Sequence, residues 1–398
     1  MIREISRRKC LRLWLCKPEY MGRTKWENRF VLLRFQKKNY MMFLKDLKRF
    51  KMERLYDKLK AYSESDFYAF HMPGHKRNKA LLGIELPYDL DITEIDGFDD
   101  LHHADGILKE EQERAARVFG AEESHFLVNG STAGILSAVM GCTHRGDKIL
   151  VARHCHKSIY HAIYMNGLVP RYVYPEFDIS MHMNGEISKE DVAKALAAEP
   201  DIKAVVIVSP NYDGVVSDVK GIAEVAHSYR IPLIVDEAHG AHFIYHEAFP
   251  ERANDLGADV VINSLHKTLP SLTQTAILHI NGKIVNRRRI KKYLDMLQSS
   301  SPSYIFMASL DACVDFLDGK CEEAFELYVE RLQKFREELE PLQHLQILRT
   351  EHYDISKVVI STANANITSP ELAERLRKEY HLEMEMCGAD YVTAIAAI

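Results

Sequence analysis

The sequence predicts an α/β fold whose mainly parallel sheet is covered by helices on both faces. Short apolar runs alternate with segments of helical periodicity, and these runs lie at residues 125–128, 148–152, 204–209, 232–237 and 259–264. Strands that are apolar throughout, each followed by a helix, are typical of a parallel sheet buried on both faces. The chain of 398 residues is long enough for one large and one smaller domain. We place the large domain at residues 121–305.

An N-terminal segment, residues 52–120, precedes this domain. We expect a short helix at 53–62, followed by the loop HMPGHKRN with its Pro-Gly turn. The acidic stretch at 89–106 reads as irregular, and the apolar spacing at 107–119 predicts an amphipathic helix.

A small C-terminal α+β domain is expected at residues 306–398. Residues 327–342 have heptad-like apolar spacing, the stretch HYDISKVVIST contains the short apolar run VVI, and a helical pattern recurs near 370–379. Because the chain stops abruptly at AIAAI, we expect this domain to be incomplete.

Residues 1–51 differ in charge from the rest of the chain. They hold 16 Lys+Arg and 4 Asp+Glu, whereas the whole chain has a net charge of −5. A basic arm can bind nucleic acid or anionic lipid. We favour a basic N-terminal extension outside the fold, or a misread start, because Met52 opens a segment that reads as the beginning of a domain. We therefore expect no nucleic-acid partner.

The composition, 46% hydrophobic and 27% charged, is ordinary for a globular enzyme. No apolar run approaches the roughly 20 residues that span a bilayer, and no signal-peptide pattern is present, so we expect no membrane partner. The seven cysteines are dispersed without a CxxC pair. This pattern predicts reduced thiols, a cytoplasmic protein and no metal site.

A polar turn follows the first apolar strand. In HFLVNGSTAGI we expect the strand to end at Val128 and a helix to begin near Ala133. Gly130, Ser131 and Thr132 then lie at a helix N-terminus, where backbone N–H groups and hydroxyls suit a phosphate. Ser and Thr are also favoured N-caps without any ligand, so both interpretations stay open.

Two further strand ends carry Asp236 and Lys267. Ligands collect at the carboxyl ends of strands in open α/β sheets. Asp236 follows IPLIV and needs a partner: either the next helix, which it would cap, or the ring nitrogen of pyridoxal 5'-phosphate (PLP), whose protonation it would secure. Lys267 follows DVVINS, where desolvation favours the free amine that forms imines, and Ser264 could add a phosphate contact. The order of turn, Asp and Lys predicts PLP held as a Schiff base on Lys267.

These stretches resemble the Orn/Lys/Arg decarboxylase family, fold-type I PLP enzymes with the aminotransferase-like fold. The resemblance runs from about Met52 to the C-terminus, and the ordered set is specific where a single element would not be. The matching stretches are FHMPGHK (70–76), DITEIDGFDDLHHADG (91–106), LVNGSTAGI (127–135), ARHCHKSIYHA (152–162), VSPNYDGVVSDV (208–219), VDEAHGAH (235–242), SLHKTLPSLTQ (264–274) and SPSY (301–304).

The resemblance implies how the cofactor is held. Ser131 and Thr132 are similar to the phosphate-binding pair, next to Gly130, and Ser264 is similar to a further phosphate contact. His156 resembles the histidine that stacks on the cofactor ring. Without the resemblance, His156 would read as a buried, hydrogen-bonded histidine.

The resemblance also implies the catalytic residues. Asp236 is similar to the partner of the pyridine nitrogen, and His266 and Lys267 are similar to the pair that bears the imine. His239 and His242 are further candidate pocket residues.

The activity implied is decarboxylation of arginine, lysine or ornithine to an amine that serves as a polyamine precursor. We expect Lys267 or His266 to protonate the α-carbon after CO₂ leaves. The acidic stretch with Asp96 and Asp99 is a candidate pocket for the basic end of the substrate. The family resemblance further implies a homodimer or higher homo-oligomer. Which basic amino acid is used does not follow from the sequence.

Two alternatives stay open. One is another fold-type I chemistry, aminotransfer or Cβ elimination, although an aminotransferase would usually need an arginine clamp for the substrate carboxylate. The other is an inactive, truncated homologue that acts as an interaction partner, which the retention of His156, Asp236 and Lys267 argues against. The chain resembles the short biosynthetic type of Gram-positive bacteria, without a receiver-like wing domain. Such enzymes usually continue past the position of Ile398, so we expect a C-terminal truncation.

Overall fold

The computed structural model describes residues 53–80, 82–179, 182–348, 350 and 352–398. Arg54–Ile398 form one compact unit. The basic extension predicted at residues 1–51 lies outside the described residues.

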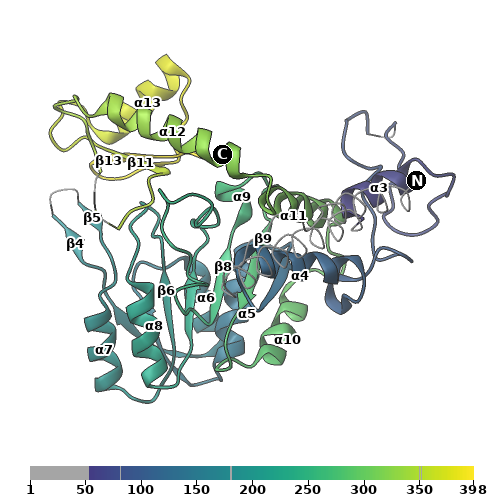
Figure 1. The fold of residues 1–398 in the computed structure, drawn as a ribbon, viewed down its shortest axis with the longest axis horizontal. Helices are drawn as coiled ribbons and strands as arrows, with labels where there is room; N and C mark the ends of the chain where they lie inside the picture. Colours follow the sequence, from purple (N-terminus) through teal and green to yellow (C-terminus); the bar gives the residue numbers. More distant parts are fainter. Residues whose placement is uncertain (1–52, 81, 180–181, 349, 351) are drawn as a thin grey trace, which may run out of the picture. The chain divides into compact units, whose positions relative to one another are not determined.

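The described part of the chain is built around a seven-stranded sheet in the order β1-β9-β8-β7-β6-β2-β3 (Figure 1). Its strands are β1 (Glu123–Leu127), β2 (Lys148–Ala152), β3 (Val169–Val173), β6 (Ile202–Val208), β7 (Leu233–Asp236), β8 (Val260–Asn263) and β9 (Ala276–Ile280). β3, β2, β6, β7 and β8 pair in parallel, whereas β9 pairs antiparallel with both β8 and β1. The predicted mainly parallel sheet is confirmed, with β3 and β9 as strands that the sequence did not reveal.

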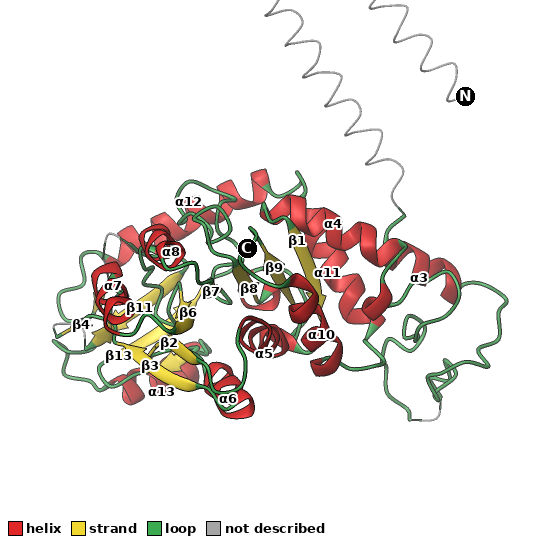
Figure 2. Cartoon of the chain, turned by 90° about the horizontal axis from the view of Figure 1, so that it is seen from below, coloured by secondary structure: helices red, strands yellow, loops and turns green. Residues whose placement is uncertain are grey.

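Helices cover both faces of this sheet (Figure 2). One face packs against α5 (Gly130–Cys142), α6 (Lys157–Asn166) and α10 (Arg287–Leu297), and the other against α7 (Lys189–Ala198) and α8 (Val219–Ser228). Successive residues of β2 show why its run is apolar throughout: Ile149 and Val151 belong to the first core and Leu150 to the second. Side chains alternate along a strand, so a strand buried on both faces has no polar side.

The N-terminal segment packs on later helices. Its helices are α3 (Leu55–Ser63), the 3-10 helix η1 (Leu101–His103) and α4 (Ile107–Phe119), and the later ones are α11 (Tyr304–Leu317) and α12 (Glu322–Leu339). Leu55, Leu108, Tyr304 and Phe325 share one core. α4 has the bounds that its apolar spacing predicts. None of the helices described is both long and apolar enough to cross a membrane.

A second, antiparallel sheet lies in the C-terminal part, in the order β10-β11-β13-β12. It consists of β10 (Gln346–Ile347), β11 (Lys357–Ser361), β12 (Met386–Cys387) and β13 (Tyr391–Ile395). α13 (Ser369–Tyr380) starts at a capping box formed by Thr368 and Glu371. β4 (Phe177–Asp178) and β5 (Met183–Asn184) form a separate two-stranded hairpin, whose Met183 packs against Val359 and Tyr391 of the C-terminal sheet. The predicted domain boundaries stay a prediction.

Candidate active site

The predicted site residues follow strands that end at one edge of the seven-stranded sheet. β2, β6, β7 and β8 are parallel, and β1 runs in the same direction as β8 because β9 is antiparallel to both. His156 follows β2, Asp236 ends β7, Lys267 follows β8 and Gly130 follows β1. Parallel strands thus bring together residues that lie far apart in the sequence.

Lys267 lies on a single helical turn, α9 (Leu265–Thr268), directly after β8. Its Nζ is 2.9 Å from Nε2 of His239. Burial lowers the pKa of Lys267 and the charge of Lys357 lowers it further, while Asp236 and Glu385 act in the opposite direction. The pKa of Lys267 is lowered overall, which increases the fraction of the neutral amine, the form that is nucleophilic.

His239 lies in the turn after β7 and is only 7% exposed. Burial and the charge of Lys267 hold the pKa of His239 well below its usual value, so the imidazole is neutral near pH 7. Its Nδ1 has no hydrogen-bond partner among the described residues, and the ring of Tyr212 meets it edge-on at 5.0 Å. A neutral imidazole has one donor and one acceptor nitrogen, so His239 can exchange a proton with Lys267.

Asp236 is the last residue of β7 and is 3% exposed. Its carboxylate accepts a hydrogen bond from the backbone N–H of Ala238 at 3.2 Å. Burial raises the pKa of Asp236, and the charge of Lys267 partly offsets this effect. A buried carboxylate is stabilised in its ionised form by a cationic partner, and a protonated ring nitrogen would be one.

The turn after β1 is held on both sides. The backbone carbonyl of Val128 accepts a hydrogen bond from Nε2 of Gln274 at 2.6 Å. The backbone N–H of Val128 donates a hydrogen bond to Oε1 of Gln298 at 2.9 Å. Gly130, the first residue of α5, has a φ of +72°, which glycine adopts without strain. Ser131 and Thr132 follow it in the first turn, where backbone N–H groups lack intrahelical partners and suit an anion.

Two buried hydroxyls near Lys267 lack partners. Ser264 is 0% and Thr268 is 2% exposed, and neither side-chain oxygen has a hydrogen-bond partner among the described residues. Buried polar atoms are nearly always hydrogen-bonded, so these two hydroxyls are available to bind a ligand group. Together with the α5 N-terminus, these hydroxyls fit the phosphate of the cofactor predicted from the sequence.

His156 is the N-cap of α6, and its Nδ1 lies 2.8 Å from Oγ of Ser158. The side chain of His156 is exposed, in contrast to the buried histidine that the sequence alone suggests; partial desolvation lowers its pKa, and the charge of Lys267 adds to this effect. His156 therefore lies within the electrostatic reach of Lys267, as a residue that covers the cofactor ring would. Its stacking role stays a prediction.

The other two predicted histidines have different partners. Nδ1 of His266 lies 2.9 Å from the carbonyl of Thr275, which marks Nδ1 as the donor nitrogen. His242 is 1% exposed, and its Nε2 lies 3.1 Å from Oδ1 of Asp354. The described contacts thus place His242 in a buried ion network behind His239.

Sequence reasoning missed Tyr212 and Glu385. The hydroxyl of Tyr212 donates to the Glu385 carboxylate, whose charge acts on Lys267. Glu385 precedes β12, and no local pattern distinguishes it from the other acidic residues of the chain. Asp99, by contrast, accepts hydrogen bonds from the backbone N–H groups of Asp100, Asp105, Gly106 and Leu108, which gives its carboxylate a local structural role.

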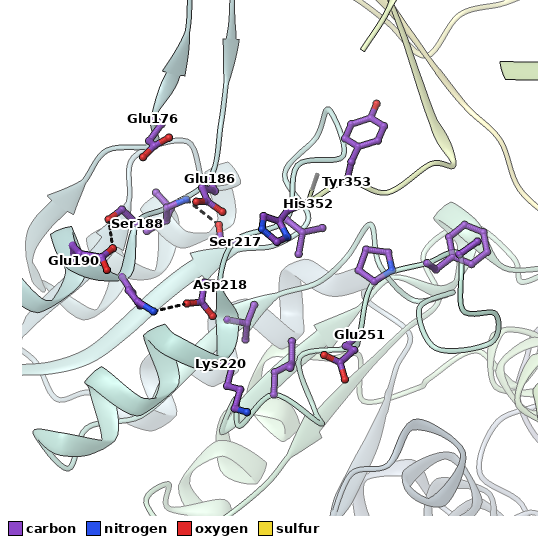
Figure 3. Close-up of a pocket in the computed structure, with 18 of the residues that line it drawn as sticks. Glu176, Glu186, Ser188, Glu190, Ser217, Asp218, Lys220, Glu251, His352 and Tyr353 are labelled. Carbon is purple, nitrogen blue, oxygen red and sulfur yellow. Dashed lines mark hydrogen bonds and ion pairs between the residues drawn. The ribbon is translucent and has the colours of Figure 1, made fainter. Parts of the chain in front are cut away.

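A cavity of about 740 Å³ lies elsewhere, lined by residues of the β5–α7 connection, the start of α8 and the segments 247–251 and 352–353 (Figure 3). Its lining includes none of the predicted site residues. Asp218 pairs with Lys189 at 3.3 Å, and Glu190 accepts from Ser188 at 2.9 Å. Asp218 and Glu190 thus both have partners within the lining of the cavity, and we assign no ligand to it.

Comparison with known sequences gives a consistent result. The family described as "Orn/Lys/Arg decarboxylase, major domain" matches residues 53–365. An arginine decarboxylase of Bacillus subtilis is 34% identical over 347 residues, covering 83% of this chain and 71% of that protein. The uncharacterized protein YaaO of Bacillus subtilis is 43% identical over 275 residues, 68% of this chain, and this chain spans 57% of YaaO.

Solved structures share the fold. Lysine decarboxylase A from Pseudomonas aeruginosa has a TM-score of 0.75 at 23% identity, covering 90% of this chain and 58% of that one. An alanine–glyoxylate aminotransferase from Nostoc sp. has a TM-score of 0.59 at 16% identity, covering 73% and 81%. These likenesses confirm the predicted aminotransferase-like fold class. The chain spans less than two thirds of the solved lysine decarboxylase.

Proposed function

This chain belongs to the Orn/Lys/Arg decarboxylase family, and from this premise we propose that it removes the α-carboxyl group of a basic amino acid with PLP bound at Lys267. The observation that carries the proposal is the contact of 2.9 Å between Nζ of Lys267 and Nε2 of His239, beside the buried Asp236. A desolvated lysine in contact with a neutral imidazole is suited to imine formation and proton transfer.

We infer which residues would hold PLP. The α5 N-terminus with Gly130, Ser131 and Thr132 would bind the phosphate, aided by the unpartnered hydroxyl of Ser264. His156 would cover the ring. When bound, PLP supplies an electron sink for the negative charge that develops at the α-carbon as CO₂ leaves.

Side chains of this site would stabilise the charge on the cofactor ring and transfer protons. Asp236 would hold a proton on the ring nitrogen, because its buried carboxylate is stabilised by a cationic partner. Lys267 would deliver the proton to the α-carbon, and His239 would exchange it at Nε2. His266 is the other candidate donor; because its Nδ1–H is engaged by the carbonyl of Thr275, it would donate from Nε2 only when both ring nitrogens carry a proton.

A basic substrate would meet an acidic group at this site. Glu385 is, besides Asp236, a carboxylate whose charge acts on Lys267, and the Tyr212 hydroxyl donates a hydrogen bond to it. The relatives include arginine and lysine decarboxylases, and the family name adds ornithine, so arginine, lysine and ornithine are the substrates to test. The product amine would be a polyamine precursor, formed in the cytoplasm.

We also propose a homodimer or higher homo-oligomer. Phe67, Tyr68, Phe70 and Met72 of the N-terminal segment are 65–89% exposed. Contiguous apolar side chains on a surface are typical of an interface. Light scattering of the purified chain tests this proposal, and a single species of 45.8 kDa would contradict it.

The decisive experiment incubates the PLP-loaded full chain separately with arginine, lysine and ornithine. We expect release of CO₂ and of one amine, identified by mass spectrometry. Keto-acid formation without CO₂ would instead indicate an aminotransferase. Visible absorbance of bound PLP without turnover of any of the three would favour an inactive homologue.

A further inference from the structure

A buried ion pair joins the C-terminal sheet to the turn that carries His239. Lys357, the first residue of β11, and Asp354 are both 0% exposed. Nζ of Lys357 lies 2.9 Å from Oδ2 of Asp354 and donates to the carbonyl of His239 at 3.4 Å. His239 is therefore contacted by two lysines, Lys357 at its backbone and Lys267 at its side chain.

The Asp354 carboxylate is fully engaged at the centre of this network. Oδ1 accepts hydrogen bonds from Nε2 of His242 at 3.1 Å and from the backbone N–H of Ser356 at 3.0 Å. Oδ2 accepts a hydrogen bond from the Ser356 hydroxyl at 2.7 Å. Burial alone would raise the pKa of Asp354, but Lys357 and His242 hold it well below its usual range. The carboxylate is thus ionised and binds the His242 end of the turn, while its partner Lys357 binds the His239 end.

We propose that Lys357 and Asp354 are positioning residues that hold His239 against Lys267, so that the C-terminal sheet completes the site formed at the edge of the parallel sheet. This inference rests on the proposed function, because it assigns the pair a role in preparing Lys267 for reaction. Neither residue touches the reacting atoms in this scheme; both act through His239.

A purely structural role explains these contacts less well. A buried ion pair is often no more stabilising than apolar residues of the same volume, so stability alone is a weak reason to find one here. The ammonium of Lys357 is aimed at the backbone of a site residue. Its charge also lowers the pKa of both Lys267 and His239, beyond the larger effect of burial.

The first test measures the amine of Lys267 directly. The full chain without added PLP is methylated to low extent with formaldehyde and cyanoborohydride across a pH series, and labelling at Lys267 is compared with that at the exposed Lys283 by peptide mass spectrometry. In Lys357→Met we expect the pH midpoint of Lys267 labelling to rise by about 1 unit, a tenfold change in the free amine. The other groups that act on Lys267 are unchanged in this variant; they are Asp236, Glu385, His239 and His156.

Arg114→Met is the matched control. Arg114 is 5% exposed and is the cation of another buried ion network, with Glu111, Asp311 and Asp315. It should leave the Lys267 midpoint at the wild-type value even if it destabilises the fold. An unchanged midpoint in Lys357→Met, or an equal shift in Arg114→Met, overturns the proposal.

A second variant covers the case in which Lys357→Met does not fold. Lys357→Met with Asp354→Asn removes the pair without leaving an uncompensated buried charge. Hydrogen exchange at the imidazole carbon of His239, read by mass spectrometry, should then become several-fold faster because the backbone contact is lost. Wild-type exchange would overturn the proposal. Both tests use neither substrate nor turnover, so a protein that releases no amine would refute the proposed function without deciding this one.

Discussion

Nζ of Lys267 lies 2.9 Å from Nε2 of His239, although 28 residues separate them in the chain. The two follow the adjacent parallel strands β8 and β7, so the sheet itself determines that they meet. Burial lowers the pKa of both Lys267 and His239, which favours the neutral form of each group. The contact gives a proton a direct path between Nζ of Lys267 and Nε2 of His239.

Replacing Lys267 with alanine should abolish the proposed reaction. We expect amine formation to fall by about 10³-fold or more, because the residue would both bear the cofactor and transfer a proton. Steady-state assays of the PLP-loaded variant measure this loss. Lys283→Ala removes an exposed lysine and should keep wild-type turnover. Substantial amine release by Lys267→Ala would contradict the assignment.

Asp236→Asn should lower turnover by about 10²- to 10³-fold, because an electrostatic partner of the reaction is lost while the shape is kept. It should also shift the pH midpoint of Lys267 labelling downward, since the charge of Asp236 raises the pKa of Lys267. This direction is opposite to that expected for Lys357→Met. Asp201→Asn, at an exposed carboxylate paired with Lys148, serves as the control. A midpoint that rises in Asp236→Asn would refute the electrostatic account.

Glu385→Gln should raise KM for the basic amino acid by about tenfold, the loss of one charge-assisted contact, with a smaller effect on kcat. The comparison of kcat and KM separates substrate attraction from chemistry. Glu383→Gln alters an exposed glutamate two residues earlier and should leave KM unchanged. Equal changes in KM for both variants would argue against a specific role of Glu385.

The buried His279 should make the fold sensitive to acid. Burial lowers its pKa from 6.5 to about 3. Below pH 6.5 the unfolded chain binds a proton that the folded chain does not, so the free energy of unfolding falls as the pH drops from about 6.5 toward 3. By about pH 5 this group alone lowers that free energy by about 2 kcal/mol.

His279→Phe removes this titration and can keep the stacking on Phe119. We expect the fall in Tm between about pH 7.5 and pH 5 to be smaller in this variant than in the wild type. His344→Phe, at an exposed histidine, should retain the wild-type pH dependence. Identical pH profiles for His279→Phe and the wild type would show that other groups control acid unfolding.

Local patterns predicted most of the central sheet, because strands buried on both faces must be apolar throughout. β3 was missed because it lies at the sheet edge and contains Pro170 and Arg171 in place of an apolar run. β9 was missed because it directly follows the Lys267 loop and includes the polar His279. Its antiparallel direction has no local signature, since direction depends on the path of the connection.

The site residues can also be divided into those that local patterns predict and those that they do not. Asp236, Lys267 and the Gly130 turn could be predicted because each directly follows a recognisable strand, and such strand ends meet at one edge of a sheet. The sequence by itself thus determined the fold class and the candidate cofactor residues. Only the tertiary structure paired His239 with Lys267 and brought Glu385 and Lys357 to them from the C-terminal sheet. These contacts depend on how the two sheets pack together: Lys357 is buried only through that packing and Glu385 stays exposed, so neither residue has a local signature in the sequence.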